Sequence, residues 1–183
     1  MRRAARQPAE RPAAEPAPST REPRTWQGIV YRPCQAGAAA VRGLFQYAGA
    51  FAPALASEEL AWEAEAAERL VGGVLVERRG VQGMIHGPVV VEPPTGTEPL
   101  EVAAQLVAAV ITEAEAAGLD TLYARPQGLD RVWVRAGFVP VPEATLPDSL
   151  RGRPGAGLHA WRRPGSYVVA SPERGAPGFR ARG

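Results

Sequence analysis

The most regular pattern of apolar and polar positions in this sequence lies between Glu98 and Ala117, where apolar residues recur at steps of three and four. Polar residues occupy the opposite side, so the segment predicts one amphipathic helix. Thr97 is the predicted N-cap, and Gly118 suits the position after the helix, where the backbone turns left-handed. The apolar positions are Leu100, Ala103, Val107, Val110, Ile111 and Ala114.

Short runs of branched apolar residues predict strands on both sides of this helix. Before it we expect a strand over Thr25 to Cys34, a helix over 36–51 and an antiparallel meander of three strands over 61–93, with a bulge at glycines such as Gly87. After it we expect a strand over 119–126, a short helix over 128–137 and strands over 138–144 and 155–165. The step from strand to helix to strand predicts a parallel crossover. The pattern therefore predicts an α/β (α+β) fold, with a mixed, mostly antiparallel central sheet of about seven strands flanked by helices.

The two ends of the chain differ from its middle in composition. Residues 1–24 are rich in Arg, Pro and Ala, and residues 171–183 are equally poor in large apolar side chains. Neither segment can bury enough area to offset its ordering entropy, so we expect disordered tails at 1–24 and 171–183 around a single domain at 25–170. The tails hold nine Arg and four Glu of the chain's 21 basic and 19 acidic residues, which leaves 12 Arg and 15 acids, a net charge of −3, in the domain.

Composition also limits the classes of function. The chain has one cysteine, Cys34, and two histidines, His86 and His159, which lie far apart in the sequence, so we expect no disulfide and no metal site. No apolar run approaches the roughly 18 residues that cross a bilayer, and the start of the sequence lacks the apolar stretch of a secretory signal. We expect a cytoplasmic protein without membrane contact. The basic residues of the tails are not interleaved with aromatic residues, which disfavours specific nucleic-acid binding.

Several strings in the middle of the chain resemble one family in order and spacing. These strings are ERLVGGVLVERRG at 68–80, VVVEP at 89–93, AAQLVAAVITEAEAAGLDTLYA at 103–124 and DRVWVRAGFVPV at 130–141. They resemble the GNAT superfamily of acyl-CoA-dependent N-acetyltransferases over roughly residues 28–169. The resemblance implies that acetyl-CoA or another acyl-CoA is a substrate. It also implies a small-molecule or protein amine as acceptor, which attacks the thioester directly in a ternary complex.

The resemblance further implies a pyrophosphate-binding loop where the long helix begins. Members of the family carry Arg or Gln, two spacers, Gly, one spacer and then Gly or Ala, whereas this chain has Glu98 to Ala103 there, and only Ala103 matches. Glu101 would repel a phosphate and Pro99 lacks an N–H group, so the loop is degenerate. The amides of Gly96 and Thr97 are a substitute cradle for the anion. The cofactor-binding candidates are Val89, Val91, Gly96, Thr97, Leu100, Val102, Ala103 and Trp133.

The catalytic groups of the family are matched only in part. A Tyr that protonates the leaving thiolate commonly lies four residues before the Gly of a Gly-Phe pair, but that position is Trp133 here, and its indole delivers no proton at neutral pH. The strand at 89–91 is expected to supply a backbone N–H that polarises the thioester carbonyl. His86 and Glu92 are the candidate bases, against the alternative that each has only a structural or solvated role.

Three functions remain open. They are, in order, an N-acetyltransferase, a catalytically inactive binding or assembly protein of the same fold, and a nucleic-acid accessory protein that acts through its tails. The segments 51–59 and 146–157 are the variable loops expected to build the acceptor pocket. A homodimer, or docking to a larger assembly through the tails, is an expected mode of association.

Overall fold

A computed structural model of the chain describes residues 22–35, 37, 39–54 and 59–165. The predicted tail at 171–183 and most of the tail at 1–24 lie outside these residues. Arg24 already belongs to the first strand, so regular structure begins one residue earlier than predicted.

The N-terminal segment is a hairpin and not the single strand predicted over Thr25 to Cys34. Strand β1, Arg24–Trp26, pairs antiparallel with β2, Ile29–Pro33. Gln27 and Gly28 join them with positive φ angles of 47° and 74°. Two consecutive residues with φ above zero form the turn that matches strand twist, so the chain reverses at the Gln-Gly pair inside the predicted strand.

The predicted helix and three-stranded meander are confirmed. Helix α1 spans Ala39–Tyr47, and the antiparallel strands are β3, Leu60–Ala66, β4, Arg69–Arg79, and β5, Gln82–Val90. Gly73 pairs with Val89 but Leu75 pairs with His86, so the register shifts and β5 carries an extra residue at this point. Gly87 lies in this bulge with φ 87°, and a Cβ there would lie 3.0 Å from the Phe45 ring. Only glycine fits this position without strain.

The long helix α2, Pro99–Ala116, begins one residue later than predicted. Its N-cap is Glu98, which makes no side-chain cap bond, and Pro99 takes the first helical position, which proline favours. Thr97 does not cap the helix; its N–H closes a turn onto the Pro94 carbonyl at 2.9 Å. The predicted end is confirmed, because Gly118 turns left-handed and the N–H of Leu119 bonds back to Ala114.

The remaining elements complete an eight-stranded sheet. They are β6, Thr121–Ala124, α3, Asp130–Arg135, β7, Val139–Pro140, two short 3-10 helices at Glu143–Thr145 and Asp148–Leu150, and β8, His159–Arg162. The strand order is β1-β2-β3-β4-β5-β6-β8-β7. The pair β5 and β6 is parallel, as the crossover through α2 predicts, and every other neighbouring pair is antiparallel. The mixed, mostly antiparallel α+β fold is confirmed, with eight strands in place of about seven.

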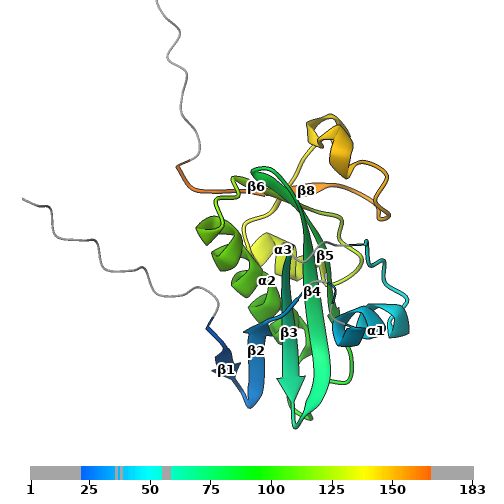
Figure 1. The fold of residues 1–183 in the computed structure, drawn as a ribbon, viewed down its shortest axis with the longest axis vertical. Helices are drawn as coiled ribbons and strands as arrows, with labels where there is room; N and C mark the ends of the chain where they lie inside the picture. The colour runs from blue at the N-terminus through cyan, green and yellow to red at the C-terminus, as the bar shows by residue number, and fades with distance from the viewer. Residues whose placement is uncertain (1–21, 36, 38, 55–58, 166–183) are drawn as a thin grey trace, which may run out of the picture.

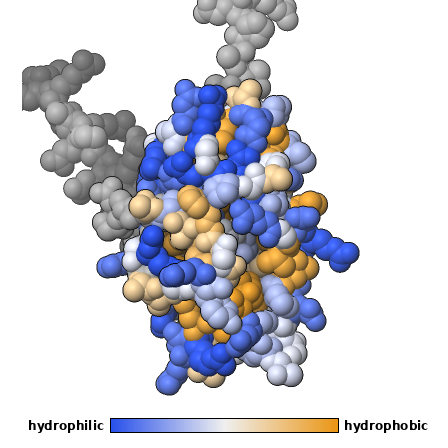
Figure 2. Space-filling view, turned by 90° about the vertical axis from the view of Figure 1, so that its right-hand side faces the viewer, coloured by the Kyte–Doolittle hydropathy of each residue, from blue (hydrophilic) through white to orange (hydrophobic). Residues whose placement is uncertain are grey.

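Helices α1 and α2 lie on opposite sides of this sheet (Figure 1). Neighbouring residues of β4 show the division, because Val74 packs in the cluster under α2 and α3 while Leu75 packs under α1. We call these sides the α2 face and the α1 face. The α2 face carries one large apolar cluster around Trp62, whereas the α1 face carries two small ones, separated by the buried polar residues Glu77 and His86. On the side of the molecule that carries α1, polar and apolar residues are interspersed (Figure 2).

Candidate functional site

Strands β5 and β6 separate where β6 ends. Their parallel pairing runs from Gln82 opposite Thr121 to Ile85 opposite Ala124, but β5 continues to Val90 while β6 stops. Within the described part of the chain, the edge of β5 from His86 onward therefore has no neighbouring strand on that side. A cavity of about 260 Å³ opens at this edge. It is lined by Ala48–Phe51 after α1, by Met84–Val90 of β5, by Arg125 and residues 127–129 after β6, and by Arg153 and Pro154.

The backbone of β5 directs one peptide group toward this edge. The N–H of Val91 donates to the Val71 carbonyl of β4 at 2.8 Å, so Val91 faces the neighbouring strand. Peptide groups alternate along a strand, and Val90, opposite Gly72, therefore points its N–H and carbonyl away from β4. The same alternation turns the amide of Val89 toward β4. The sequence indicates Val89 and Val91 as the binding residues, but Val90 is the one whose N–H faces the cavity edge.

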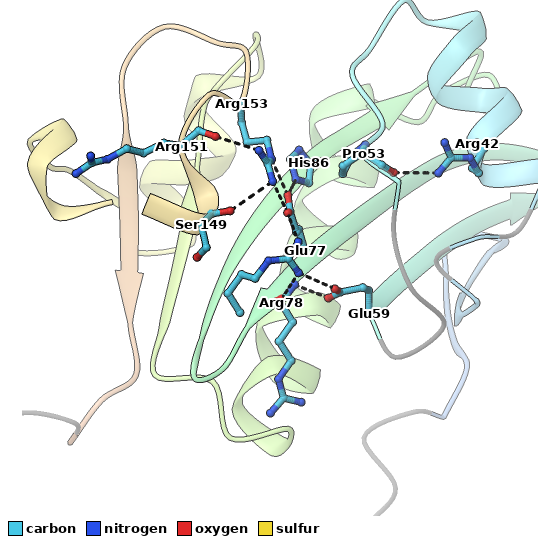
Figure 3. Close-up of polar contacts among 10 residues, drawn as sticks. Arg42, Pro53, Glu59, Glu77, Arg78, His86, Ser149, Arg151 and Arg153 are labelled. Carbon is cyan, nitrogen blue, oxygen red and sulfur yellow. Dashed lines mark hydrogen bonds and ion pairs between the residues drawn. The ribbon is translucent and has the colours of Figure 1, made fainter. Parts of the chain in front are cut away.

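His86 lies in the cavity wall and is held by a buried carboxylate. Its side chain is 6% exposed, and its Nε2 lies 3.2 Å from Oε2 of Glu77, which is 2% exposed. Glu77 also accepts a hydrogen bond from Arg153 Nε at 2.8 Å (Figure 3). A further hydrogen bond comes from Arg79 Nη2 at 2.7 Å. The Phe51 ring stands 5.5 Å from the His86 ring. Segments from β4, β5 and the loop before β8 thus meet at one ionised carboxylate.

The charges of this group follow from burial and pairing. Burial lowers the pKa of His86 to about 4, against the opposing effect of Glu77. Hydrogen bonds from Arg153 hold the pKa of Glu77 below its usual value, although its burial acts in the other direction. Near neutral pH the pair is therefore a neutral imidazole and a carboxylate. Because a carboxylate only accepts hydrogen bonds, Nε2 carries the ring proton and Nδ1 retains a lone pair. Nδ1 has no partner among the residues that the structure describes.

Glu92, the other candidate base, lies elsewhere. Its carboxylate pairs with Arg69 at 2.8 Å and its side chain is 65% exposed. It lines a separate shallow hollow between α1 and the start of β4, together with Tyr47 and Val91. The structure does not bring Glu92 into the cavity that His86 lines.

The segment before α2 offers fewer free amides than the sequence suggests. The N–H of Thr97 is used in the turn with Pro94. The amides of Gly96, Glu98 and Leu100 donate no hydrogen bond to any residue within the described part of the chain. The space beside Gly96 is open, since a Cβ added there would have no atom within 4 Å. The space beside Gly96 thus leaves its amide accessible, whereas Thr97 is not a free donor.

The first turns of α2 contact the rest of the protein in two ways. Glu101 does not stand alone, because its Oε1 pairs with Nη1 of Arg135 on α3 at 3.0 Å. Val102 and Ala103 are fully buried in the core of the α2 face, and Leu100 packs against it. The side chains of Val102 and Ala103 thus pack in the core beneath the start of α2 and are not exposed at the surface of the loop.

Trp133 is a core residue. It is 1% exposed, packs edge-on against Phe138 with ring centres 5.0 Å apart, and does not line the cavity. Its Nε1 is buried and has no hydrogen-bond partner among the described residues. The position at which the family resemblance implies a proton donor is therefore filled by packing.

Sequence reasoning missed three of the residues that build this site. Glu77 and Arg153 are 76 positions apart, and Arg153 lies in a Pro- and Gly-rich segment without periodicity. Arg125 follows β6 directly, where a polar residue at a strand end is the only signal. The two segments expected to build the acceptor pocket both reach this cavity, through Phe51 and Arg153, although residues 55–58 of the first segment lie outside the described residues.

The described residues contain neither a candidate metal site nor a candidate membrane-spanning helix. They contain no group of three or more His, Cys, Asp or Glu placed to hold a metal ion. Among them, too, no helix combines the length and the apolar character that crossing a membrane requires.

Comparison with known proteins gives matches at the level of structure. No protein-family model and no curated protein matches the chain. An acetyltransferase from Streptococcus agalactiae superposes with a TM-score of 0.56 at 14% identity, over 75% of this chain and 100% of that one. The catalytic domain of a Tetrahymena histone acetyltransferase in complex with coenzyme A gives 0.54 at 8% identity, over 75% and 95%.

A longer enzyme matches in part. N-acetylglutamate synthase from Neisseria gonorrhoeae, in complex with coenzyme A and N-acetyl-glutamate, gives a TM-score of 0.55 at 18% identity. The match covers 72% of this chain but only 35% of the synthase. At these identities the comparisons establish a shared fold, which is that of the GNAT acetyltransferases.

Proposed function

We propose that this protein is an acyl-CoA-dependent N-acetyltransferase that transfers the acyl group directly to an amine in a ternary complex. The observation that carries the proposal is the open edge of β5, where the strands diverge, a cavity begins and the N–H of Val90 is turned away from β4. A thioester placed along this edge would extend the sheet through backbone groups. The acceptor amine would enter from the part of the cavity that His86 lines.

The Val90 N–H is the proposed donor to the thioester carbonyl oxygen. Negative charge develops on that oxygen as the amine attacks, and a fixed backbone donor stabilises it without reorganisation. The new C–N bond forms and the C–S bond breaks, which yields an amide and a thiolate. The remaining contribution of the site is to hold both reactants in position.

His86 is the proposed carrier of the proton that the amine loses. The nitrogen's proton passes to Nδ1, and the imidazolium then gives it to the departing thiolate. Since the pKa of His86 is about 4, the ring is neutral at ordinary pH and its protonated form is acidic enough to release the proton readily. Glu77 acts as a positioning residue, because its bond to Nε2 leaves Nδ1 as the proton acceptor.

The degenerate loop before α2 is the proposed contact for the pyrophosphate. The free amides of Gly96, Glu98 and Leu100 and the positive end of the α2 dipole supply the attraction. The pairing of Glu101 with Arg135 offsets the negative charge that argues against an anion here. The loop therefore remains compatible with a phosphate despite its missing glycines.

The alternative is a catalytically inactive binding or assembly protein of the same fold. It is favoured by the buried Trp133, which leaves the leaving-group position without an acid, and by Pro99 and Glu101 in the anion loop. Such a protein would retain acyl-CoA or lose it, but would not transfer the acyl group.

A combined binding and turnover experiment separates these functions. Thermal unfolding is followed with acetyl-CoA and with CoA, and release of free thiol is measured against a panel of amines. A ligand at one hundred times its Kd stabilises by about 2.7 kcal/mol, so binding is readily visible. Stabilisation with thiol release supports the enzyme, and stabilisation without transfer supports the alternative. No stabilisation at millimolar acetyl-CoA contradicts the proposal.

Two variants give the experiment a matched control. Val90→Pro removes the proposed donor at a position whose N–H is not bonded to β4, whereas Val91→Pro removes a hydrogen bond of the sheet itself. We expect Val90→Pro to lose transfer while its unfolding remains cooperative, and Val91→Pro to lose stability.

A further inference from the structure

The charges that face the cavity are all of one sign. Its lining residues include two arginines, Arg125 and Arg153, and no Asp or Glu among the described residues. Each arginine has a carboxylate partner, but neither Glu143 nor Glu77 belongs to the lining. Both ion pairs thus present their positive ends to the cavity and hold their negative ends away from it.

Arg125 differs from Arg153 in its carboxylate partner, because Glu143 is exposed and Glu77 is buried, although the Arg125 side chain itself is only 11% exposed. It pairs with Glu143 through Nη1 at 2.6 Å and Nη2 at 2.7 Å, yet the side chain of Glu143 is 60% exposed. An ion pair with so exposed a partner is weak, because water competes for the carboxylate. The Nε of Arg125 is buried and has no hydrogen-bond partner in the described chain. A buried donor without an acceptor is unfavourable, and an acceptor atom that meets Nε when the guanidinium turns toward the cavity would relieve it.

Arg153 has a different part in the same wall. Its Nε and Nη2 are bonded to the buried Glu77, and its Nη1 donates to the Arg151 carbonyl, so its position is fixed. It contributes a stationary positive charge beside His86 and is not freely movable. The neutral His86 adds no opposing charge.

On the premise that the protein is an acyltransferase, we propose that its acceptor is a primary amine that also carries a carboxylate, that is, a free amino acid. The carboxylate lies against Arg125, which offers planar paired donors suited to that group, and the amine lies toward His86. The same positive lining repels acceptors with a second cationic group, such as diamines and lysine-rich peptides. It also favours the neutral form of the attacking amine, which is the reactive one.

The test compares each of the standard amino acids with its own carboxamide, and includes putrescine as a cationic probe. Binding is measured by calorimetry in the presence of CoA, and transfer by thiol release from acetyl-CoA. We expect at least one amino acid to bind and react about ten to a hundredfold better than its carboxamide, and putrescine to be the poorest acceptor. Equal use of acids and carboxamides, or a preference for putrescine, overturns the proposal.

Variants locate the effect. Arg125→Gln should lower kcat/KM for the amino acid by about tenfold or more while changing that for the carboxamide by less than about threefold. Arg131→Gln, an exposed arginine of α3 outside the cavity, is the matched control and should change neither. Glu143→Gln frees the guanidinium and should lower KM for the acid. An equal loss for both acceptors in Arg125→Gln contradicts the assignment.

The two proposals fail in different ways. If acyl transfer occurs but does not distinguish acids from carboxamides, the acceptor assignment is wrong and the acyltransferase stands. If no transfer occurs with any acceptor, calorimetry still decides the carboxylate site. Binding of an amino acid that Arg125→Gln abolishes supports the site, and its absence overturns it.

Discussion

The two faces of the sheet are built from the same strands but covered in different ways. The α2 face is closed by one long helix and by α3, over a single cluster of 24 buried apolar residues that includes Trp62 and Val74. The α1 face is covered by one short helix and by the segment before β8, over two clusters of six residues each. Between those two clusters lie Glu77, His86 and the cavity.

The difference shows which face of the sheet can hold a cluster of polar and charged side chains. The continuous apolar cover of the α2 face holds a buried carboxylate, Glu113, which accepts a hydrogen bond from the Trp62 indole, because a buried charge without a partner is strongly unfavourable. The interrupted cover of the α1 face leaves a gap that a paired carboxylate and a histidine occupy. The α2 face therefore accounts for stability, and the α1 face holds the groups proposed for function.

The largest expected effect falls on the α2 face. Trp62→Ala removes a fully buried indole that also donates to Glu113, and should lower the free energy of unfolding by about 3–5 kcal/mol. Trp62→Phe keeps most of the volume and should cost less. The measurement is urea unfolding at neutral pH. A loss below about 1 kcal/mol would show that this face does not carry the stability.

A pH series sharpens the comparison, because the pKa of His86 is lowered from 6.5 to about 4. Between these values the unfolded chain binds a proton that the folded chain does not, so stability is lost as the pH falls from 6.5 toward 4. The loss in the free energy of unfolding that His86 causes should reach about 3 kcal/mol near pH 4. His86→Gln should remove this part of the slope. Parallel pH profiles for the two proteins would refute the assignment.

Glu77→Ala probes the polar group of the α1 face. It removes the partner of His86, Arg79 and Arg153, but those arginines are 42% and 24% exposed and can turn toward water. We expect a loss of about 2 kcal/mol, less than for the buried tryptophan. Acyl transfer should fall more than binding of acetyl-CoA does. An unchanged kcat in a folded Glu77→Ala variant would remove Glu77 from the mechanism.

The smallest expected effect concerns the anion loop at the edge of the α2 face. Because Glu101 is paired with Arg135, Glu101→Gln should change the Kd for CoA by less than about threefold. Arg135→Gln leaves the Glu101 carboxylate unpaired, and it should therefore raise the Kd for CoA by more than Glu101→Gln changes it. The titration is calorimetric. A gain near a hundredfold in Glu101→Gln would mean that the carboxylate points at the phosphate.

The sequence predicts the fold well wherever a pattern is local. The periodicity of α2, the glycine after it and the branched runs of β3 to β5 identified these elements and their parallel crossover. The turn at Gln27 and Gly28 was missed because one Gln-Gly pair lies within a short run of strand-forming residues that predicts a single strand, and the eighth strand follows from this turn. The N-cap was misplaced by one residue because Pro99 takes the first helical position, which makes Glu98 the N-cap.

The site was predicted in part, for a related reason. His86 and Gly96 were identified from residue type and position, but the roles of neighbouring valines depend on register, which shifts at the bulge. A single extra residue in β5 determines which amide faces the cavity, and Gly87 marks the bulge in the sequence without fixing the register of the pairing. Glu77 and Arg153 are 76 positions apart in the sequence, and only the tertiary fold brings them into contact.

The most direct test of the account is an amide chemical-shift titration with acetyl-CoA, in which the signals of Val90 and Val91 are followed together. The open edge of β5 predicts that the Val90 amide shifts strongly and saturably while the Val91 amide, bonded to Val71, moves little. If neither amide responds at millimolar acetyl-CoA, or if only Val91 does, the diverging strands do not hold a thioester.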